Sequence, residues 1–345
     1  MIAADTEDSP LKIGLRWTAA AIGTYIVAHS VFQALTRFRL KGKVALITGG
    51  SRGLGLVLAR QLGYRGVSVA ICARSADDLA KAQQDLEERG IPAFPIIADV
   101  TIPEEVDAAV RDTINHFGRV DVLINNAGII QVGPQDLMDL SDYQLAMQTN
   151  FWAHLYAMHA VIPHFTERGG GRIVNITSIG GKLALPHLLP YTASKFAAVG
   201  LSEGMHAELR KYNIIVTTVV PNLMRTGSPL NADIKGDYQR EYAWFKHADS
   251  NPLLSQSAEH VAERIIRAIE YGESEVTLSL SAKLATFVKG FAPGWVNTIM
   301  RIADRLLPTA ITSDKTAVKG WQAESSLSQG PISRLTDNAA RKNNQ

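Results

Sequence analysis

The feature of this chain that most constrains its fold is a regular alternation of short β-rich runs with helical stretches. The β-rich runs occupy residues 44–48, 67–72, 93–97, 120–125, 172–177 and 214–219. Stretches with helical character lie between them, at residues 54–64, 77–89, 103–117, 141–165 and 191–212. Strands that are apolar throughout and separated by helices are typical of a parallel sheet covered on both faces. Because crossovers between parallel strands are right-handed, the alternation predicts a doubly wound parallel α/β sheet, the Rossmann fold.

Composition narrows the class of protein. Apolar residues make up 46% of the chain and charged residues 20%, which is ordinary for a globular protein with a full core. The formal net charge of +2 gives no electrostatic reason to expect nucleic acid as a partner. The lone cysteine, Cys72, excludes a disulfide framework and fits a reducing compartment.

The histidines do not suggest a metal site. His154, His159 and His164 are the closest set, and their spacing by fives does not place them on one face of a helix. We therefore expect no bound metal.

The alternating pattern of strands and helices is lost before residue 41 and after residue 281, and these points set the expected domain boundaries. Residues 41–281 form one Rossmann domain, with an apolar segment 1–40 before it and an amphipathic extension 282–312 after it. Residues 227–256 form a long segment beside the expected ligand site, which favours a substrate lid over about 223–256. Residues 313–345 are polar and are predicted to be disordered.

Two flanking segments raise the question of a membrane. Residues 11–38 are apolar between basic residues but contain His29, Ser30 and Gln33, so they could lie on or in a membrane, span it, or pack on the protein. Residues 282–307 are amphipathic and could meet a membrane surface, cap the domain or form a dimer surface. The expected location is the cytoplasm, with attachment to a membrane through the N-terminal segment as an alternative.

A glycine-rich turn follows the first expected strand. It consists of Thr48, Gly49, Gly50, Ser51, Arg52, Gly53, Leu54 and Gly55. Glycines allow a tight turn and a close approach of the backbone to a phosphate, and the following helix offers unpaired N–H groups to that anion. Its place after the first strand of an alternating unit predicts a dinucleotide site.

The end of the second expected strand indicates which dinucleotide. NAD sites usually have a carboxylate there for the ribose 2′-hydroxyl, but this strand ends in Ala73 and Arg74. Arg74 and Arg52 could instead pair with a 2′-phosphate through charge-assisted hydrogen bonds. The expected cofactor is therefore NADP(H), with NAD as the less favoured choice.

Taken together, these motifs resemble the short-chain dehydrogenase/reductase family over roughly residues 43–281. The residues that carry the resemblance are the turn TGGSRGLG (48–55), Asp99 and Val100 in ADVT, Asn125, Asn126, Ala127 and Gly128 in NNAG, the segment from Pro221 to Thr226, and Asn150, Ser178, Tyr191 and Lys195. The resemblance implies that Asp99 binds the adenine, that NNAG lines the cofactor, and that Thr226 contacts the nicotinamide amide. It also implies that Asn150, Ser178, Tyr191 and Lys195 form a catalytic tetrad, and that the protein is a homo-oligomer.

The chemistry of these residue types is consistent with those roles. Tyr191 and Lys195 are four residues apart, so they share one face of the expected helix. A neighbouring ammonium would lower the pKa of the phenol and let it exchange a proton with an alcohol or carbonyl oxygen. Ser178 could hydrogen-bond that oxygen as charge develops on it. Lys195 could also hold the nicotinamide ribose, and Asn150 could position a water.

The expected substrate pocket is apolar. Leu185, Pro186, His187, Leu188, Leu189 and Pro190 flank the tyrosine, and Leu223, Met224, Tyr242, Trp244 and Phe245 belong to the lid. Asn222 departs from the family pattern, which has glycine there. Asparagine tolerates left-handed backbone, so we expect the turn to form, with its side chain near the nicotinamide.

The sequence therefore predicts an NADP(H)-dependent oxidoreductase acting on a carbonyl or secondary alcohol of a lipophilic molecule. The alternative is a non-catalytic NADP(H)-binding sensor or membrane-associated scaffold. A hydrolase is disfavoured, because the G-x-S-x-G match at Ser202 falls inside an expected helix instead of a strand–turn–helix elbow.

Overall fold

The structure is a computed structural model that describes residues 16–17, 20, 23–24, 37–252, 255–310, 313–331 and 333–345. The chain divides into two compact units, Met1–Arg39 and Leu40–Gln345. The predictions for the apolar segment 11–38 fall almost entirely outside the described residues. Within the part of the chain that is described, no helix has both the length and the apolar character needed to cross a bilayer.

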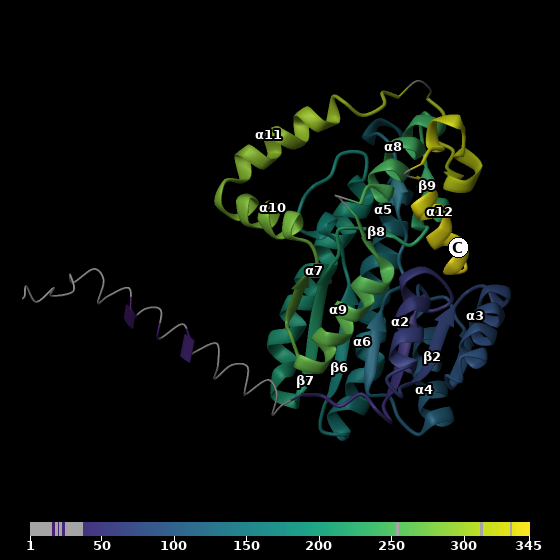
Figure 1. The fold of residues 1–345 in the computed structure, drawn as a ribbon, viewed down its shortest axis with the longest axis vertical. Coiled ribbons are helices and arrows are strands. Elements are labelled where there is room, and N and C mark those ends of the chain that lie inside the picture. Colours follow the sequence, from purple (N-terminus) through teal and green to yellow (C-terminus); the bar gives the residue numbers. More distant parts are fainter. Residues whose placement is uncertain are drawn as a thin grey trace, which may run out of the picture. The chain divides into compact units, whose positions relative to one another are not determined.

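The second unit is built on a seven-stranded sheet with the order β11-β7-β6-β4-β1-β2-β3 (Figure 1). Its strands are β1 (Val44–Thr48), β2 (Ser68–Ala73), β3 (Ala93–Ile97), β4 (Val122–Asn125), β6 (Gly171–Ile176), β7 (Ile214–Val220) and β11 (Glu275–Thr277). Every neighbouring pair is parallel. The predicted doubly wound α/β fold is confirmed.

The sheet is covered by helices whose apolar faces follow from their sequences. They are α2 (Gly53–Gly63), α3 (Ala76–Glu88), α4 (Pro103–Phe117), α5 (Leu140–Met147), α6 (Ala153–Glu167), α7 (Leu189–Leu209) and α9 (Ala258–Tyr271). In α9, Val261, Ile265 and Ile269 recur at helical spacing and are all fully buried. On one face of the sheet, α4 and α6 share a core cluster with β1, β4 and β6. The strands are buried because helices cover both faces.

Residues 223–252 and 255–257 form a layer beyond the carboxyl ends of the strands. It contains β8 (Leu223–Arg225), β9 (Asp233–Ile234), α8 (Tyr238–Ser250) and β10 (Ser255–Ser257). Tyr242 and Phe245 of α8 belong to a second core cluster with Leu188 and Ile234. This layer lies at the end of the sheet where open α/β proteins bind ligands.

Two helices, α10 (Leu280–Phe291) and α11 (Pro293–Asp304), follow the last strand of the sheet and form a hairpin (Figure 1). Ala282 and Val296 anchor the hairpin in a third core cluster that includes Ile179. The exposed apolar side chains of this region are Leu280, Leu284, Phe287, Phe291, Trp295, Ile299, Ile302 and the following Leu306. Large exposed apolar side chains that are concentrated in one segment often mark an interaction site.

The prediction that residues 313–345 are disordered is wrong. They contain β12 (Val318–Lys319), which pairs with β9, and α12 (Ser333–Lys342). The segment is too polar to form a core, but its polar groups find partners on the domain. The ammonium of Lys246, a fully buried side chain of α8, lies 2.8 Å from carboxylate oxygens of both Glu324 and Asp337. Composition could not reveal these tertiary ion pairs.

Candidate active site

The glycine-rich turn connects β1 to α2 and fits closely against the loop after β4. Thr48 Oγ1 accepts hydrogen bonds from the N–H groups of Asn126 at 3.1 Å and Ala127 at 3.2 Å. Asn126 Nδ2 donates in return to the carbonyl oxygens of Thr48 and Gly49. A Cβ at Gly49 would lie 2.9 Å from Ala127 Cα, and φ of Gly49 is +64°. Only glycine satisfies both constraints.

A cavity of about 370 Å³ lies over this turn. It is lined by most of the predicted cofactor residues: Gly49, Ser51, Arg52, Gly53, Leu54, Arg74, Asp99, Val100, Asn126, Ala127, Gly128, Tyr191, Lys195 and Thr226. Three other predicted residues support its walls instead of lining it. Thr48 and Gly55 hold the turn, and Pro221 accepts a hydrogen bond from the N–H of Ile179 at 2.7 Å. The cavity therefore has the position and the backbone clearance that a dinucleotide requires.

Both arginines expected to bind the 2′-phosphate of the cofactor, Arg52 and Arg74, line the larger cavity. Arg74 is 68% exposed, and its guanidinium is 3.6 Å from Asp99. Arg52 donates to Asn231 Oδ1 at 2.9 Å and lies 3.9 Å from Asp78. Burial raises the pKa of Asp99, but hydrogen bonds from Thr101 and Arg74 outweigh it and hold the carboxyl below its usual range. The arginines face carboxylates on the cavity wall, and the exposure of Arg74 leaves its guanidinium accessible to an anion.

The predicted catalytic residues converge where this cavity meets a smaller one. Tyr191, in the first turn of α7, lines both cavities, and Ser178 lines the smaller. The side chain of Ser178 is hydrogen-bonded to the Tyr191 phenol and accepts from the N–H of Gly180 at 3.0 Å. Lys195 Nζ lies 5.8 Å from the centre of the Tyr191 ring and donates to the carbonyl of Ile176 at 3.0 Å.

The pKa of Tyr191 shifts in the direction opposite to the sequence expectation. Burial raises it, and the Ser178 hydrogen bond opposes that effect only in part. Burial also lowers the pKa of Lys195 to about 8. The ammonium is directed at the Ile176 carbonyl, so in the protein alone it does not offset the desolvation of the phenol. The neutral phenol is the form that donates a proton.

Asn150 is placed by an irregular turn. It lies in the π-helical turn η2 (Gln148–Trp152) between α5 and α6, a type of distortion that often occurs at functional sites. Its amide accepts from the N–H of Ile129 at 3.0 Å and donates to the carbonyl of Ile129 at 3.1 Å and to Ser194 Oγ at 3.0 Å. Ser194 Oγ donates to the Tyr191 carbonyl. Asn150 thus joins the loop after β4 to the start of α7.

The smaller cavity, of about 80 Å³, is mainly apolar. Its lining consists of Ile130, Ser178, Ile179, Leu185, Leu188, Tyr191, Asn222, Leu223, Met224, Ser228, Phe245 and Asp249. Of the residues predicted for a substrate pocket, Leu185, Leu188, Leu223, Met224 and Phe245 are present. His187 is instead held by Glu241 of α8, whose carboxylate lies 2.8 Å from Nδ1.

Asn222 occupies its turn without left-handed backbone, since its φ is not positive. This position therefore does not require a residue that tolerates left-handed backbone. Its side-chain amide donates to Ser279 Oγ at 3.3 Å and to Ser281 Oγ at 3.4 Å. This polar contact ties the loop after β7 to the start of α10.

Sequence reasoning missed Asp249, a buried acid in the smaller cavity. Its side chain belongs to a residue only 2% exposed, and burial raises its pKa to about 8 despite hydrogen bonds from the Met224 N–H and Thr336. The one sequence feature that could have revealed Asp249 is its position on α8, because Asp249 is a carboxylate on a helix whose Tyr242 and Phe245 belong to the core.

This carboxyl makes stability depend on pH. Its pKa in the folded state lies above the unfolded value, so the native state binds the extra proton and stability falls as pH rises from about 4 to about 8. Asp249→Asn should remove up to ~5 kcal/mol of that loss. Thermal melts at pH 5 and pH 9 should show the variant gaining stability relative to the native protein at both values, with a much larger gain at pH 9. Asp107→Asn, on the exposed side of α4, is the control, and equal gains in both variants would contradict the assignment.

The hydrolase alternative has no structural support. Ser202 lies well inside α7, is fully buried, and accepts hydrogen bonds from Asn175 Nδ2 at 3.0 Å and Thr218 Oγ1 at 2.7 Å. It therefore completes a buried polar network under the sheet. Across the described ranges, no cluster of His, Cys, Asp and Glu side chains could hold a metal ion.

Comparisons with known proteins agree with this geometry. A family model described as short chain dehydrogenase matches residues 43–236. Dehydrogenase/reductase SDR family member 7B of Xenopus tropicalis is 31% identical over 82% of this chain and 91% of its own length. The fatty acyl-CoA reductase of Acinetobacter baylyi is 31% identical over 88% of this chain and 96% of its own.

Solved structures share the fold. A 7α-hydroxysteroid dehydrogenase in complex with NADH and 7-oxo glycochenodeoxycholic acid is 27% identical, with a TM-score of 0.61 over 70% of this chain and 94% of its own. A gluconate 5-dehydrogenase from Burkholderia cenocepacia with NADP and tartrate is 28% identical, with a TM-score of 0.63 over 72% and 98%. The chain therefore belongs to the short-chain dehydrogenase/reductase family of oxidoreductases.

Proposed function

We propose that this protein is an NADP(H)-dependent oxidoreductase that interconverts a carbonyl and a secondary alcohol on a lipophilic small molecule. The observation that carries the proposal is the position of Tyr191. Its side chain lines both the cavity over the glycine turn and the smaller apolar cavity, beside the Ser178 hydroxyl. A substrate oxygen in the smaller cavity would meet both hydroxyl groups.

Each residue of the site has a separate role in the proposed reaction. A bound nicotinamide supplies or accepts the hydride. Tyr191, kept protonated by burial, donates its phenolic proton to the carbonyl oxygen in reduction and takes it back in oxidation. Ser178 stabilises the charge that develops on the same oxygen. Lys195 and Asn150 hold the surrounding backbone and the start of α7, which fixes the orientation of the phenol.

Several features support a lipophilic substrate and a catalytic role. The apolar lining of the smaller cavity favours a lipophilic substrate, and residues 223–256 would cover it as a lid. The relatives named as acting on fatty acyl-CoA or bound to a bile-acid derivative are consistent with that class. A non-catalytic sensor or scaffold is less well supported, because binding alone requires no convergence of Tyr191, Ser178 and Lys195 beside a second cavity.

The exposed apolar side chains near the C-terminal hairpin also indicate a partner besides the substrate. The exposed apolar side chains of α10 and α11 would bind a membrane surface or a second copy of the chain, and the exposed basic residues Lys283 and Arg301 on these helices favour an anionic membrane.

Incubation of the purified protein with NADPH and a panel of lipophilic ketones and aldehydes tests the proposed activity. We expect oxidation of NADPH, followed by absorbance, with at least one member of the panel. Binding of NADPH without turnover of any carbonyl, or of any secondary alcohol with NADP, would remove the enzyme assignment in favour of the sensor.

Replacing Arg74 tests the choice of cofactor. Loss of a charge-assisted contact with the 2′-phosphate should weaken NADPH binding by about tenfold to a hundredfold in Arg74→Ala, with little effect on NADH. Fluorescence titration with both dinucleotides measures this. Arg65→Ala is the control, because Arg65 follows α2 and its guanidinium donates to the carbonyl of Gln61 at 2.9 Å. Equal losses for NADPH and NADH would remove the phosphate assignment.

A further inference from the structure

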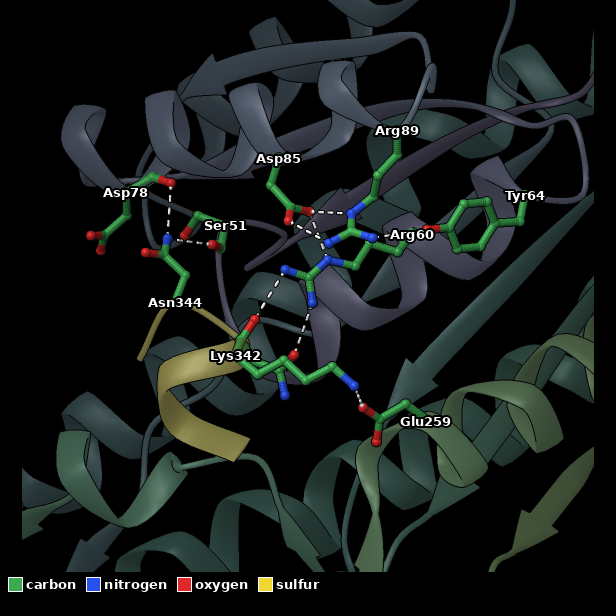
Figure 2. A network of polar contacts seen from close by, with 10 residues as sticks. Ser51, Arg60, Tyr64, Asp78, Asp85, Arg89, Glu259, Lys342 and Asn344 are labelled. Carbon is green, nitrogen blue, oxygen red and sulfur yellow. Dashed lines mark hydrogen bonds and ion pairs between the residues drawn. The ribbon is translucent and has the colours of Figure 1, made fainter. Parts of the chain in front are cut away.

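The C-terminal segment 333–345 lies across the glycine-rich turn. The N–H of Gly53, at the start of α2, donates to the carbonyl of Asn343 at 2.8 Å. Asn344 Nδ2 donates to the carbonyl of Ser51 at 3.0 Å and to that of Asp78 at 3.2 Å (Figure 2). Two consecutive residues, Asn343 and Asn344, that were expected to lie in a disordered tail thus contact the turn expected to hold the cofactor phosphates.

The segment is anchored on both sides of the turn. Arg60 of α2, only 9% exposed, donates to Asn343 Oδ1 at 2.9 Å and to the carbonyl of Lys342 at 3.1 Å, and it is fixed by Asp85 at 2.7 Å (Figure 2). Upstream, Thr336 of α12 accepts a hydrogen bond from Ser250 of α8 at 2.8 Å. The charge-assisted bonds of Arg60 and the buried bond between Ser250 and Thr336 hold the segment in one position.

The last residue of this segment, Gln345, lines the cofactor cavity, and its amide has a defined orientation. Arg52, which can only donate, bonds Asn231 Oδ1 at 2.9 Å, so Asn231 Nδ2 faces Gln345 and donates to its Oε1 at 2.6 Å. Gln345 Nε2 is therefore directed elsewhere. An ideal Cβ on Gly53 would lie 2.4 Å from it and 3.9 Å from Cβ of Thr226.

Gln345 Nε2 has two N–H groups and no acceptor among the described residues. It lies beside the N-terminus of α2, where backbone N–H groups and the helix dipole favour an anion. A pyrophosphate offers only acceptors, so it matches both the amide and the helix end. An anionic side chain in the place of Gln345 would repel the same group.

We propose that Gln345 is a ligand of the bound dinucleotide, donating from Nε2 to a pyrophosphate oxygen, and that residues 333–345 form a strap that holds it there. The inference rests on the proposed cofactor site over the glycine turn. The opposite possibility is a plug: Asn343 already occupies the N–H of Gly53, and a segment that only competed with phosphate would weaken cofactor binding. A strap would strengthen the binding of the dinucleotide, whereas a plug would weaken it.

Titration of NADPH by fluorescence, with no substrate present, decides between them. We expect Gln345→Ala to raise the dissociation constant of NADPH by about tenfold to a hundredfold, the loss of one hydrogen bond to a charged group. Gln345→Glu should bind more weakly still. Asn344→Ala, which removes two anchors of the strap, should speed NADPH release in stopped-flow measurements.

Gln329→Ala is the matched control, since Gln329 lies in the same C-terminal region with an exposed side chain. Its affinity should equal that of the native protein, and circular dichroism should show that all variants are folded. An unchanged dissociation constant in Gln345→Ala would overturn the inference, and tighter binding would identify a plug. A native protein that binds no dinucleotide would overturn the proposed function itself, which is a separate result.

Discussion

Replacing Tyr191 with phenylalanine should lower the rate of carbonyl reduction by about 10²–10⁴-fold, the usual contribution of a positioned general acid. The change removes one oxygen from a side chain that burial keeps protonated and that is hydrogen-bonded to Ser178. The ring remains to line the two cavities. We therefore expect NADPH to bind with unchanged affinity while turnover is lost, as measured by steady-state NADPH oxidation and by fluorescence titration.

Tyr212→Phe provides the comparison for this prediction. Tyr212 lies just after α7, outside both cavities, and is 43% exposed. The same chemical change there should leave both turnover and NADPH affinity at the native level. Turnover in Tyr191→Phe within a factor of two of the native protein would show that another group donates the proton.

The second large effect is expected at Gly55, in the first turn of α2. A Cβ at this position would lie 2.1 Å from the carbonyl oxygen of Gly49 and 2.7 Å from Asn126 Nδ2. The first of these atoms is backbone, so the turn itself must move. Gly55→Ala should cost ~3 kcal/mol or more in the free energy of unfolding and abolish measurable NADPH binding, because overpacking at a rigid site is destabilising.

Gly204→Ala tests whether this cost comes from the clash. Gly204 lies inside α7, and an added Cβ there meets nothing within 4 Å. That variant should be more stable by ~0.5–1 kcal/mol, since alanine favours helix over glycine. Urea unfolding measures both. Equal stability of the two variants would show that a Cβ at Gly55 fits without a clash, which would contradict the prediction.

Much of the domain could be predicted because its signals are local. The first six strands of the sheet in chain order lie within about two residues of their expected ranges, since apolar β-branched runs bounded by turns need no tertiary information. The same holds for α7, where the four-residue spacing brings Tyr191 and Lys195 to one face. The glycine turn and the NNAG loop were also predictable, and the structure joins them through Thr48 and Asn126.

The pKa of the phenol could not be predicted from spacing. The expectation that Lys195 lowers it assumed that the ammonium acts on the hydroxyl, but Nζ is bonded to the Ile176 carbonyl, and burial dominates. Desolvation depends on every atom packed around a group, and the sequence does not state that environment. The same is true of Asp249, whose raised pKa follows from its burial beneath α12.

The sequence by itself determined the doubly wound sheet, the glycine-rich turn and the pairing of Tyr191 with Lys195. Continuous apolar runs, glycine-rich turns and a four-residue helical spacing are signals that each lie within a short stretch of the chain. Only the tertiary structure decided where residues 333–345 lie. Their order depends on polar partners more than seventy positions away, such as Lys246 for Asp337 and Arg60 for Asn343. No local pattern encodes a contact between such distant residues, and hydrogen bonds and ion pairs hold this segment where a hydrophobic core is lacking.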